Sequence, residues 1–213
     1  FRMFGCNFKI GVITNVTHEH LDYHQNWYAY LKAKTMLFKN TQFSILNIDD
    51  KSYDFLKKKV AGKIVTYGLN KADFTPAKFP FQTKLLGKFN QYNCLAAIAA
   101  AKSLEIGDNK IRKAIVNFKG ITGRMEVICE KPFKVVVDFA HTPNGLKQAL
   151  QTLKDIPHRR LIAVFGSAGL RDAAKRPMMG RTACRLADKI IITAEDPRTE
   201  NVNTIIKQIA EGG

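Results

Sequence analysis

The sequence is poor in cysteine, in acidic residues and in long apolar segments, and each scarcity removes a class of protein. Four Cys occur in 213 residues and none forms a CxxC pair, which excludes a zinc ribbon and a thioredoxin motif. No apolar run approaches the ~20 residues of a membrane-spanning helix, so no membrane partner is expected. A content of 46% hydrophobic and 24% charged residues is typical of a globular protein rather than a disordered one. We expect a reducing, cytoplasmic location.

The shortage of acidic residues leaves a large positive charge. Lys and Arg number 34 against 18 Asp and Glu, a formal net charge of +16. Such a charge attracts anions, whether nucleic acid or phosphorylated and carboxylated small molecules. The basic residues are dispersed, and the densest run is only Lys57-Lys58-Lys59. A nucleic-acid binder more often concentrates its charge on one face, so we expect no nucleic-acid partner.

A phosphate-binding P-loop is also missing. No G-x-x-x-x-G-K-[ST] pattern occurs, so the residues show no site of their own for a nucleotide triphosphate. The sequence starts without Met and stops just after a helical pattern. We therefore expect it to be a piece of a longer protein.

Short apolar segments alternate with helical patterns along the chain. This alternation predicts an α/β fold with mostly parallel sheets covered on both faces. Strands are expected at 9–15, 43–48, 63–67, 125–129, 135–139, 161–165 and 189–193. Helices are expected at 27–38, 53–60, 90–104, 110–117, 144–154, 176–187 and 202–210. Lys131-Pro132 is the best linker, which divides the chain into domains 1–131 and 132–213.

Polar residues cluster where the predicted strands end, which is where ligands bind in such sheets. The segment His18–His24 holds three imidazoles and two carboxylates in seven residues. It could bind a divalent cation, or it could be a solvated polar turn. The segment Asp138–Pro143 could hold a ribose or a phosphate, or its Thr142 could simply cap the next helix.

Two further strand ends carry arginine. Gly166–Asp172 is a glycine-containing turn with Arg171, and Glu195–Arg198 follows the next strand. Arginines there could together pair with the carboxylates of a ligand, or each could be an ordinary surface residue.

Taken in order, these segments resemble the Mur ligases, the ATP-dependent amide-forming enzymes of peptidoglycan precursor synthesis. Within the family they resemble the ligases that add a diamino acid. The resemblance covers nearly the whole chain and is carried by Ile13–Phe38, Gly87–Ala101, Gly123–Val127, Val135–Leu146, Phe165–Gly180 and Thr193–Glu200. It implies that 1–131 is the back half of a central P-loop-type ATPase domain. It implies that 132–213 is the first part of a Rossmann-like C-terminal domain, truncated at its end.

The resemblance also implies a set of site residues, with ATP and Mg²⁺ as cofactors. His20 and a carbamylated Lys34 would bind the metal, and we expect Lys34 on the apolar stripe of its helix. Arg124 would meet the ATP phosphates during catalysis. Asn90 would contact adenine, with Asp138 and His141 in the ribose and hinge region. The amino-acid site would comprise Arg171, Glu195, Asp196, Pro197 and Arg198.

The implied reaction joins a diamino acid, meso-diaminopimelate or L-lysine, to the UDP-N-acetylmuramoyl dipeptide through an acyl phosphate. Position 196 is Asp where the family has Asn. A carboxylate there would repel the additional carboxylate of diaminopimelate, so both diamino acids stay as expected substrates. Because the P-loop is missing, this chain alone is expected to be inactive, and a monomer is expected. The alternatives are a folylpolyglutamate or cyanophycin synthetase of the same superfamily, or a noncatalytic nucleotide-binding module.

Overall fold

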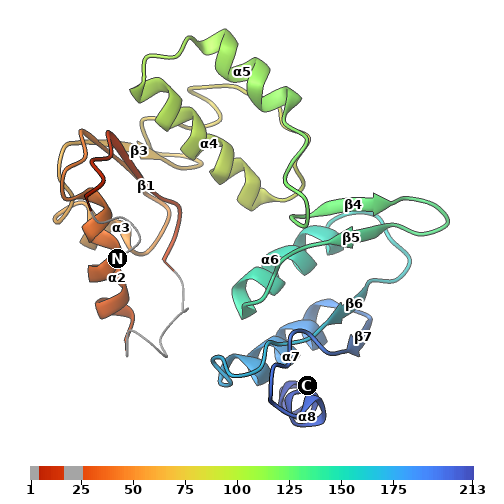
Figure 1. Cartoon of the computed structure of the whole chain (residues 1–213). Helices are drawn as coiled ribbons and strands as arrows, with labels where there is room; N and C mark the ends of the chain where they lie inside the picture. Colours follow the sequence, from red (N-terminus) through yellow and green to blue (C-terminus); the bar gives the residue numbers. More distant parts are fainter. Residues whose placement is uncertain (1–4, 17–25) are drawn as a thin grey trace. The chain divides into compact units, whose positions relative to one another are not determined.

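The computed structural model describes residues 5–16 and 26–213 and consists of two compact units (Figure 1). Unit 1 is Phe1–Lys119 and unit 2 is Gly120–Gly213. The units therefore divide before Gly120, whereas the sequence placed a domain boundary at 131/132. Within the described ranges, no helix combines the length and apolar character needed to cross a membrane.

Unit 1 is built on a three-stranded parallel sheet. Its strands are β1 (Ile10–Ile13), β2 (Phe43–Asn47) and β3 (Lys63–Tyr67), in the spatial order β1-β2-β3. All three coincide with strands predicted from short β-branched runs. Because parallel strands end at the same edge, the residues after each strand share one side of the sheet.

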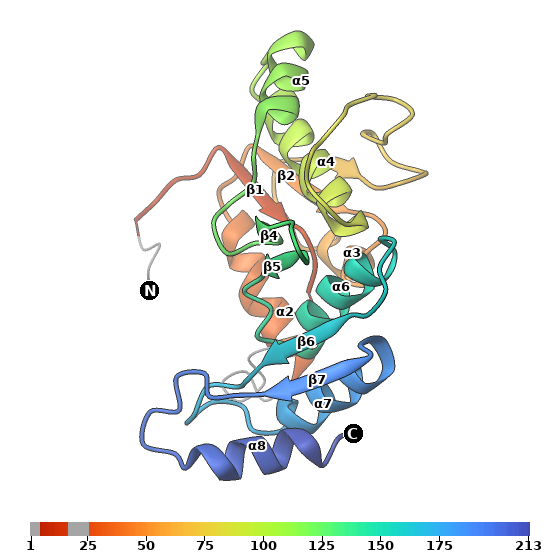
Figure 2. The ribbon, with the colours of Figure 1, turned by 90° about the vertical axis from the view of Figure 1, so that its right-hand side faces the viewer.

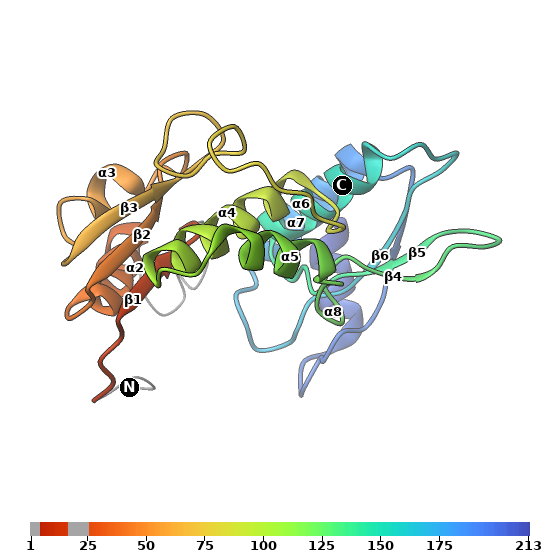
Figure 3. The same ribbon diagram turned by 90° about the horizontal axis from the view of Figure 1, so that it is seen from above.

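Helices cover both faces of this sheet (Figure 3). One face carries α4 (Lys88–Ser103) and α5 (Asp108–Asn117). The other carries α2 (Trp27–Thr35), the 3₁₀ turn η1 (Met36–Phe38) and α3 (Tyr53–Leu56). The predicted α/β layering of this unit is confirmed.

The central strand explains why two separate cores form. Ile45 and Leu46 are neighbours in β2 and both have 0% exposure. Ile45 packs in the core under α4, whereas Leu46 packs in the core under α2. Successive side chains of a strand point to opposite faces, so a run of apolar residues in β2 supplies both layers.

Unit 2 contains two small sheets. The strands β6 (Ile162–Phe165) and β7 (Lys189–Ile192) are parallel and run side by side (Figure 2). By contrast, β4 (Glu126–Cys129) and β5 (Val135–Val137) pair antiparallel. No helix separates β4 from β5, so the chain reverses directly between them, and the expected linker Lys131-Pro132 lies in this reversal.

Three helices complete unit 2, namely α6 (Pro143–Lys154), α7 (Lys175–Leu186) and α8 (Val202–Ala210). The Thr142 side chain caps α6 by accepting a hydrogen bond from the backbone N–H of Gly145 at 3.1 Å. The core lies between α6, α7 and β6 and consists of Leu146, Leu150, Ala163, Met179 and Ala183. The loops after β6 and β7 leave this core at the carboxyl ends of two parallel strands.

Candidate functional site

At the carboxyl edge of the sheet in unit 1, two hydrogen bonds fix the end of β1 and the residues that follow it. The Tyr67 hydroxyl at the end of β3 donates to the backbone oxygen of Ile13 at 3.2 Å. The backbone N–H of Val16 donates to the Asp50 carboxylate at 3.3 Å. Burial, reinforced by the negative charge of Asp50, raises the pKa of Tyr67 above its usual value. These contacts fix the segment that leads from β1 toward residues 17–25.

Asp49, which follows β2, links the end of β3 to α4 through hydrogen bonds. Its Oδ2 accepts a hydrogen bond from the backbone N–H of Leu69 at 2.8 Å and one from the Tyr92 hydroxyl at 3.1 Å. Burial and the neighbouring Asp49 carboxylate raise the pKa of Tyr92 to about 12. The sequence showed Asp49 only as the residue that follows a strand, and nothing in the local pattern pointed to these two partners.

Only one of the two predicted metal ligands belongs to the described residues. His20 lies outside the described residues. Lys34 is on α2 with its Nζ 5.0 Å from the centroid of the Tyr30 ring, and its side chain is exposed. Lys34 follows the buried Tyr30 by four positions and the buried Leu31 by three, so it lies on their side of α2 although its own side chain is exposed. Among the described residues, no group of three or more His, Cys, Asp and Glu side chains could hold a metal ion.

The exposure of Lys34 still fits the chemistry of a carbamate. An exposed amine is accessible to CO₂, and the carbamate that forms is an anionic oxygen ligand of the kind that Mg²⁺ prefers. The metal role of His20 and Lys34 remains a proposal.

Asn90 lies in the first turn of α4, where the sequence placed a contact to adenine. Its Nδ2 donates to the backbone oxygen of Leu86 at 2.7 Å, and its Oδ1 accepts from Nδ2 of Asn93 at 2.9 Å. These bonds fix the half-buried side chain at the helix start.

In unit 2, the turn that carries Arg124 is held on both sides. The backbone N–H of Gly123 donates to the Glu126 carboxylate at 2.7 Å, and that of Met125 donates to Oδ2 of Asp138 at 2.8 Å. Asp138, predicted in the ribose region, thus also has a structural task in positioning the Arg124 turn.

Arg124 and His141 both contact the ring of Phe139, the arginine over its face and the histidine in an edge-to-face arrangement. The Cζ of Arg124 lies 4.2 Å from the centroid of the Phe139 ring, and the His141 ring lies 4.9 Å from it at 67°. The Nδ1 of His141 is 3.1 Å from the Phe139 carbonyl oxygen. The structure therefore brings together three of the predicted residues, Arg124, Asp138 and His141, around Phe139, which the sequence reading passed over. The signal in the sequence was an aromatic residue, Phe139, directly between Asp138 and the His141 segment, and its ring is exposed in the structure.

The loops after β6 and β7 also meet, as the predicted pairing of strand ends requires. We call residues 166–172 the β6 loop and residues 195–200 the β7 loop. The backbone N–H of Gly169 donates to the Asp196 carbonyl at 3.0 Å. A Cβ built on Gly169 would stand 1.9 Å from the Pro197 carbonyl oxygen, so only glycine permits this approach.

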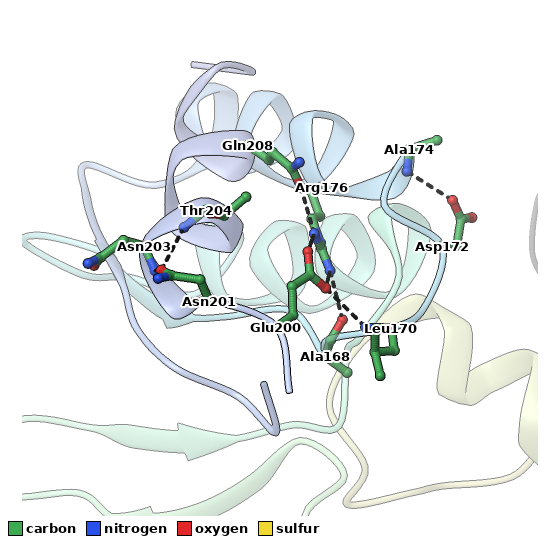
Figure 4. A network of polar contacts seen from close by, with 10 residues as sticks. All are labelled: Ala168, Leu170, Asp172, Ala174, Arg176, Glu200, Asn201, Asn203, Thr204 and Gln208. Atoms are coloured by element: carbon green, nitrogen blue, oxygen red, sulfur yellow. Dashed lines mark hydrogen bonds and ion pairs between the residues drawn. The ribbon is translucent and has the colours of Figure 1, made fainter. Parts of the chain in front are cut away.

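An ion pair between α7 and the β7 loop also contacts the β6 loop through hydrogen bonds (Figure 4). The guanidinium of Arg176, on α7 and 1% exposed, donates to Oε1 and Oε2 of Glu200 at 2.6 and 2.8 Å. The hydrogen bonds from Arg176 and from the Leu170 backbone N–H lower the pKa of Glu200 to about 2. The available signal was an arginine at the start of a helical stripe that continues with Met179, Gly180 and Ala183.

The predicted amino-acid-binding residues lie in these two loops. Arg171 and Arg198 are both exposed. The Nε of Arg198 lies 3.5 Å from Oδ2 of Asp196, and both residues adopt positive φ angles of 53° and 35°. One face of the Arg198 guanidinium is therefore already beside a carboxylate of this chain.

A sheet covered by helices, followed by a unit with arginine-bearing loops at parallel strand ends, defines an α/β protein of the class in which ligands bind at the carboxyl ends of the strands. The model of the Mur ligase middle domain matches residues 2–101. The model of the Mur ligase glutamate ligase domain matches residues 123–213. The chain belongs to the Mur ligase family.

Several curated relatives are named UDP-N-acetylmuramoyl-L-alanyl-D-glutamate--2,6-diaminopimelate ligase. The one from Oceanobacillus iheyensis is 37% identical over 96% of this chain and 48% of its own length. The one from Caldanaerobacter subterraneus is 38% identical over 99% of this chain and 48% of its own. A solved structure of a ligase of that name is 34% identical, with a TM-score of 0.62, over 99% of this chain and 49% of its own. The chain thus spans about half the length of the relatives it matches.

Proposed function

We propose that this chain forms the middle and C-terminal part of an ATP-dependent ligase that joins a diamino acid to UDP-N-acetylmuramoyl-L-Ala-D-Glu. The observation that carries this proposal is 38% identity, across 99% of the chain, to a ligase named for that reaction. The geometry of unit 2 supports it, because the β6 and β7 loops present exposed arginines at neighbouring strand ends.

The proposed reaction has two steps. The D-glutamate carboxylate attacks the γ-phosphorus of ATP, which gives an acyl phosphate and releases ADP. The amine of the diamino acid then attacks the acyl carbon, the amide forms, and inorganic phosphate leaves. A bound Mg²⁺ would neutralise the charge of the ATP phosphates, and we propose His20 and carbamylated Lys34 as its ligands from this chain.

The residues of unit 2 divide into two groups by the ligand they would meet. The Arg124 guanidinium, held over Phe139, would contact the ATP phosphates, with Asp138 and His141 toward the ribose. Arg171 and Arg198 would bind the carboxylates of the diamino acid, since a guanidinium pairs well with a carboxylate. Asn90 of unit 1 would contact adenine.

Two observations bear on the identity of the diamino acid, and they favour different substrates. The relatives are named for 2,6-diaminopimelate, which we propose as the first substrate to test. The Asp196 carboxylate beside Arg198 favours L-lysine instead, because its negative charge opposes the second carboxylate of diaminopimelate.

The deciding experiment is an assay of the ligase encoded by the complete reading frame. With ATP and the UDP-linked dipeptide, we expect amide formation and ADP release that depend on a diamino acid. ADP release that needs no diamino acid, or that instead needs a folate and glutamate, would contradict the proposal.

Lys34→Ala tests the proposed metal ligand in the same assay. We expect loss of activity that bicarbonate does not restore, because no amine remains to be carbamylated. Lys32→Ala is the matched control, since Lys32 is also exposed on α2. Equal activity in the two variants would refute the role of Lys34.

A further inference from the structure

Arg176 is an unusual residue for the interior of a protein. It lies on α7 with 1% of its surface exposed, in a stripe with Met179, Gly180 and Ala183. A buried charge is costly unless it is paired and hydrogen-bonded. None of the steps proposed above uses this guanidinium, so its burial calls for a separate explanation.

The side chain of Arg176, which lies on α7, contacts three other parts of unit 2 (Figure 4). It forms a bidentate ion pair with Glu200 of the β7 loop. Its Nη1 also donates to the side-chain oxygen of Gln208 on α8 at 2.6 Å. Its Nη2 also donates to the Ala168 carbonyl in the β6 loop at 3.2 Å. A planar guanidinium makes these bonds together, which a lysine ammonium cannot reproduce.

Glu200 also fixes Leu170, the residue that precedes Arg171. Its Oε2 accepts from the backbone N–H of Leu170 at 3.0 Å. Leu170 has φ 52°, a left-handed conformation that a branched side chain disfavours. The carboxylate thus helps to hold Leu170 in a conformation that fixes the direction in which the chain continues into Arg171.

The same pair also anchors the loop that carries Arg198. The backbone N–H of Glu200 donates to the Pro197 carbonyl at 3.0 Å, which closes the turn around Arg198. Arg198 itself has φ 53°. Both exposed arginines therefore sit on short turns that begin or end at contacts with one buried ion pair.

We propose that the Arg176–Glu200 pair is a positioning pair that sets the separation of Arg171 and Arg198 and thereby the affinity for the diamino acid. It acts through the β6 and β7 loops and not by contact with the reacting atoms. This inference rests on the proposed function, because the two arginines are assigned there to the diamino acid.

The kinetic test uses Arg176→Lys and Glu200→Gln in the complete ligase. Each variant removes the two-pronged pair, and we expect the KM for the diamino acid to rise about tenfold or more. The KM values for ATP and the UDP-linked dipeptide should stay within about twofold, because their proposed contacts lie elsewhere. Asp108→Asn, which breaks the half-exposed Lys102–Asp108 pair of unit 1, is the control and should change none of the three.

A second measurement, also on the complete ligase, needs no activity. Hydrogen exchange should accelerate at the amides of Leu170 and Gly169 in Glu200→Gln, whereas the amides of the β6–β7 ladder should stay protected. The same pattern is expected for Arg176→Lys.

The outcomes separate this inference from the proposed function. A wild-type ligase that joins no diamino acid would refute the proposed function. Unchanged exchange at Leu170 and Gly169 would overturn the positioning pair whatever the activity. Loosened loops with an unchanged KM for the diamino acid, or with all three KM values raised alike, would also overturn it.

Discussion

The guanidinium of Arg124 lies over the ring of Phe139, with its Cζ 4.2 Å from the ring centroid. The arginine is exposed and so is the ring, at 58%. A cation over an exposed aromatic face is worth about 0.5–1 kcal/mol, enough to restrict a long side chain to one region. The contact therefore restricts the Arg124 guanidinium without burying its charge, which suits the phosphate contact proposed for it.

Replacing Phe139 by leucine should weaken the use of ATP. Removing the ring frees the Arg124 side chain, so we expect the KM for ATP in the complete ligase to rise by about two- to fivefold. Phe133→Leu is the control, because Phe133 is an exposed phenylalanine of the same unit, between β4 and β5. Equal KM values for the two variants would show that the contact does not serve the nucleotide.

Asp196→Asn should shift the preference between diamino acids. The change removes the carboxylate beside Arg198, and asparagine tolerates the positive φ at this position. We expect the KM for diaminopimelate to fall by about three- to tenfold, while the KM for lysine stays level or rises. Glu130→Gln removes an equal charge at an exposed position of unit 2 and should alter neither. A parallel change for both amino acids would contradict the proposed carboxylate contact of Arg198.

The Glu200 pKa predicts a specific loss of stability in acid. The folded-state pKa of about 2 lies below the ordinary value of 4.5, so the stabilising contribution is complete above the ordinary value. It is lost as the pH falls from about 4.5 toward 2, where the carboxylate takes up a proton. We expect the thermal midpoint of the chain to fall less between pH 6 and about pH 3 in Glu200→Gln than in the wild type. Circular dichroism melts of both proteins measure this difference, and identical falls would refute the assignment.

Gly169→Ala should push the β6 and β7 loops apart. The new Cβ would stand 1.9 Å from the Pro197 carbonyl oxygen, a contact with backbone that cannot yield cheaply. We expect a loss of about 1–3 kcal/mol in the free energy of unfolding, measured by urea denaturation. Gly107→Ala is the matched control, since nothing lies within 4 Å of its Cβ position and its φ is −66°. Similar losses in both variants would show that the close approach is not the cause.

The sequence predicted the secondary structure well because apolar periodicity reports burial directly. The run 43–48 is apolar on both faces, and β2 is indeed buried on both faces. Strand direction was harder to obtain. The runs at 125–129 and 135–139 read as strands, but only the short connection between them indicates that β4 and β5 form an antiparallel pair.

The site could be predicted only in part, because its polar partners are distant in sequence. Arg171 and Arg198 stood out as exposed residues at strand ends. Their support did not, because Arg176 and Glu200 are 24 positions apart and lie in different elements. A buried arginine is recognised by its apolar helical neighbours, but its partner is found only once the loops are placed.

Tyr67 has a consequence for the behaviour of unit 1 across pH. Its hydroxyl, which anchors the end of β1 at Ile13, has a pKa raised by burial and by Asp50. The anchor therefore keeps its proton throughout the range in which a histidine imidazole gains or loses one. The attachment of the end of β1 to β3 therefore stays in place across this range, so a change of pH within it does not remodel this edge of the sheet.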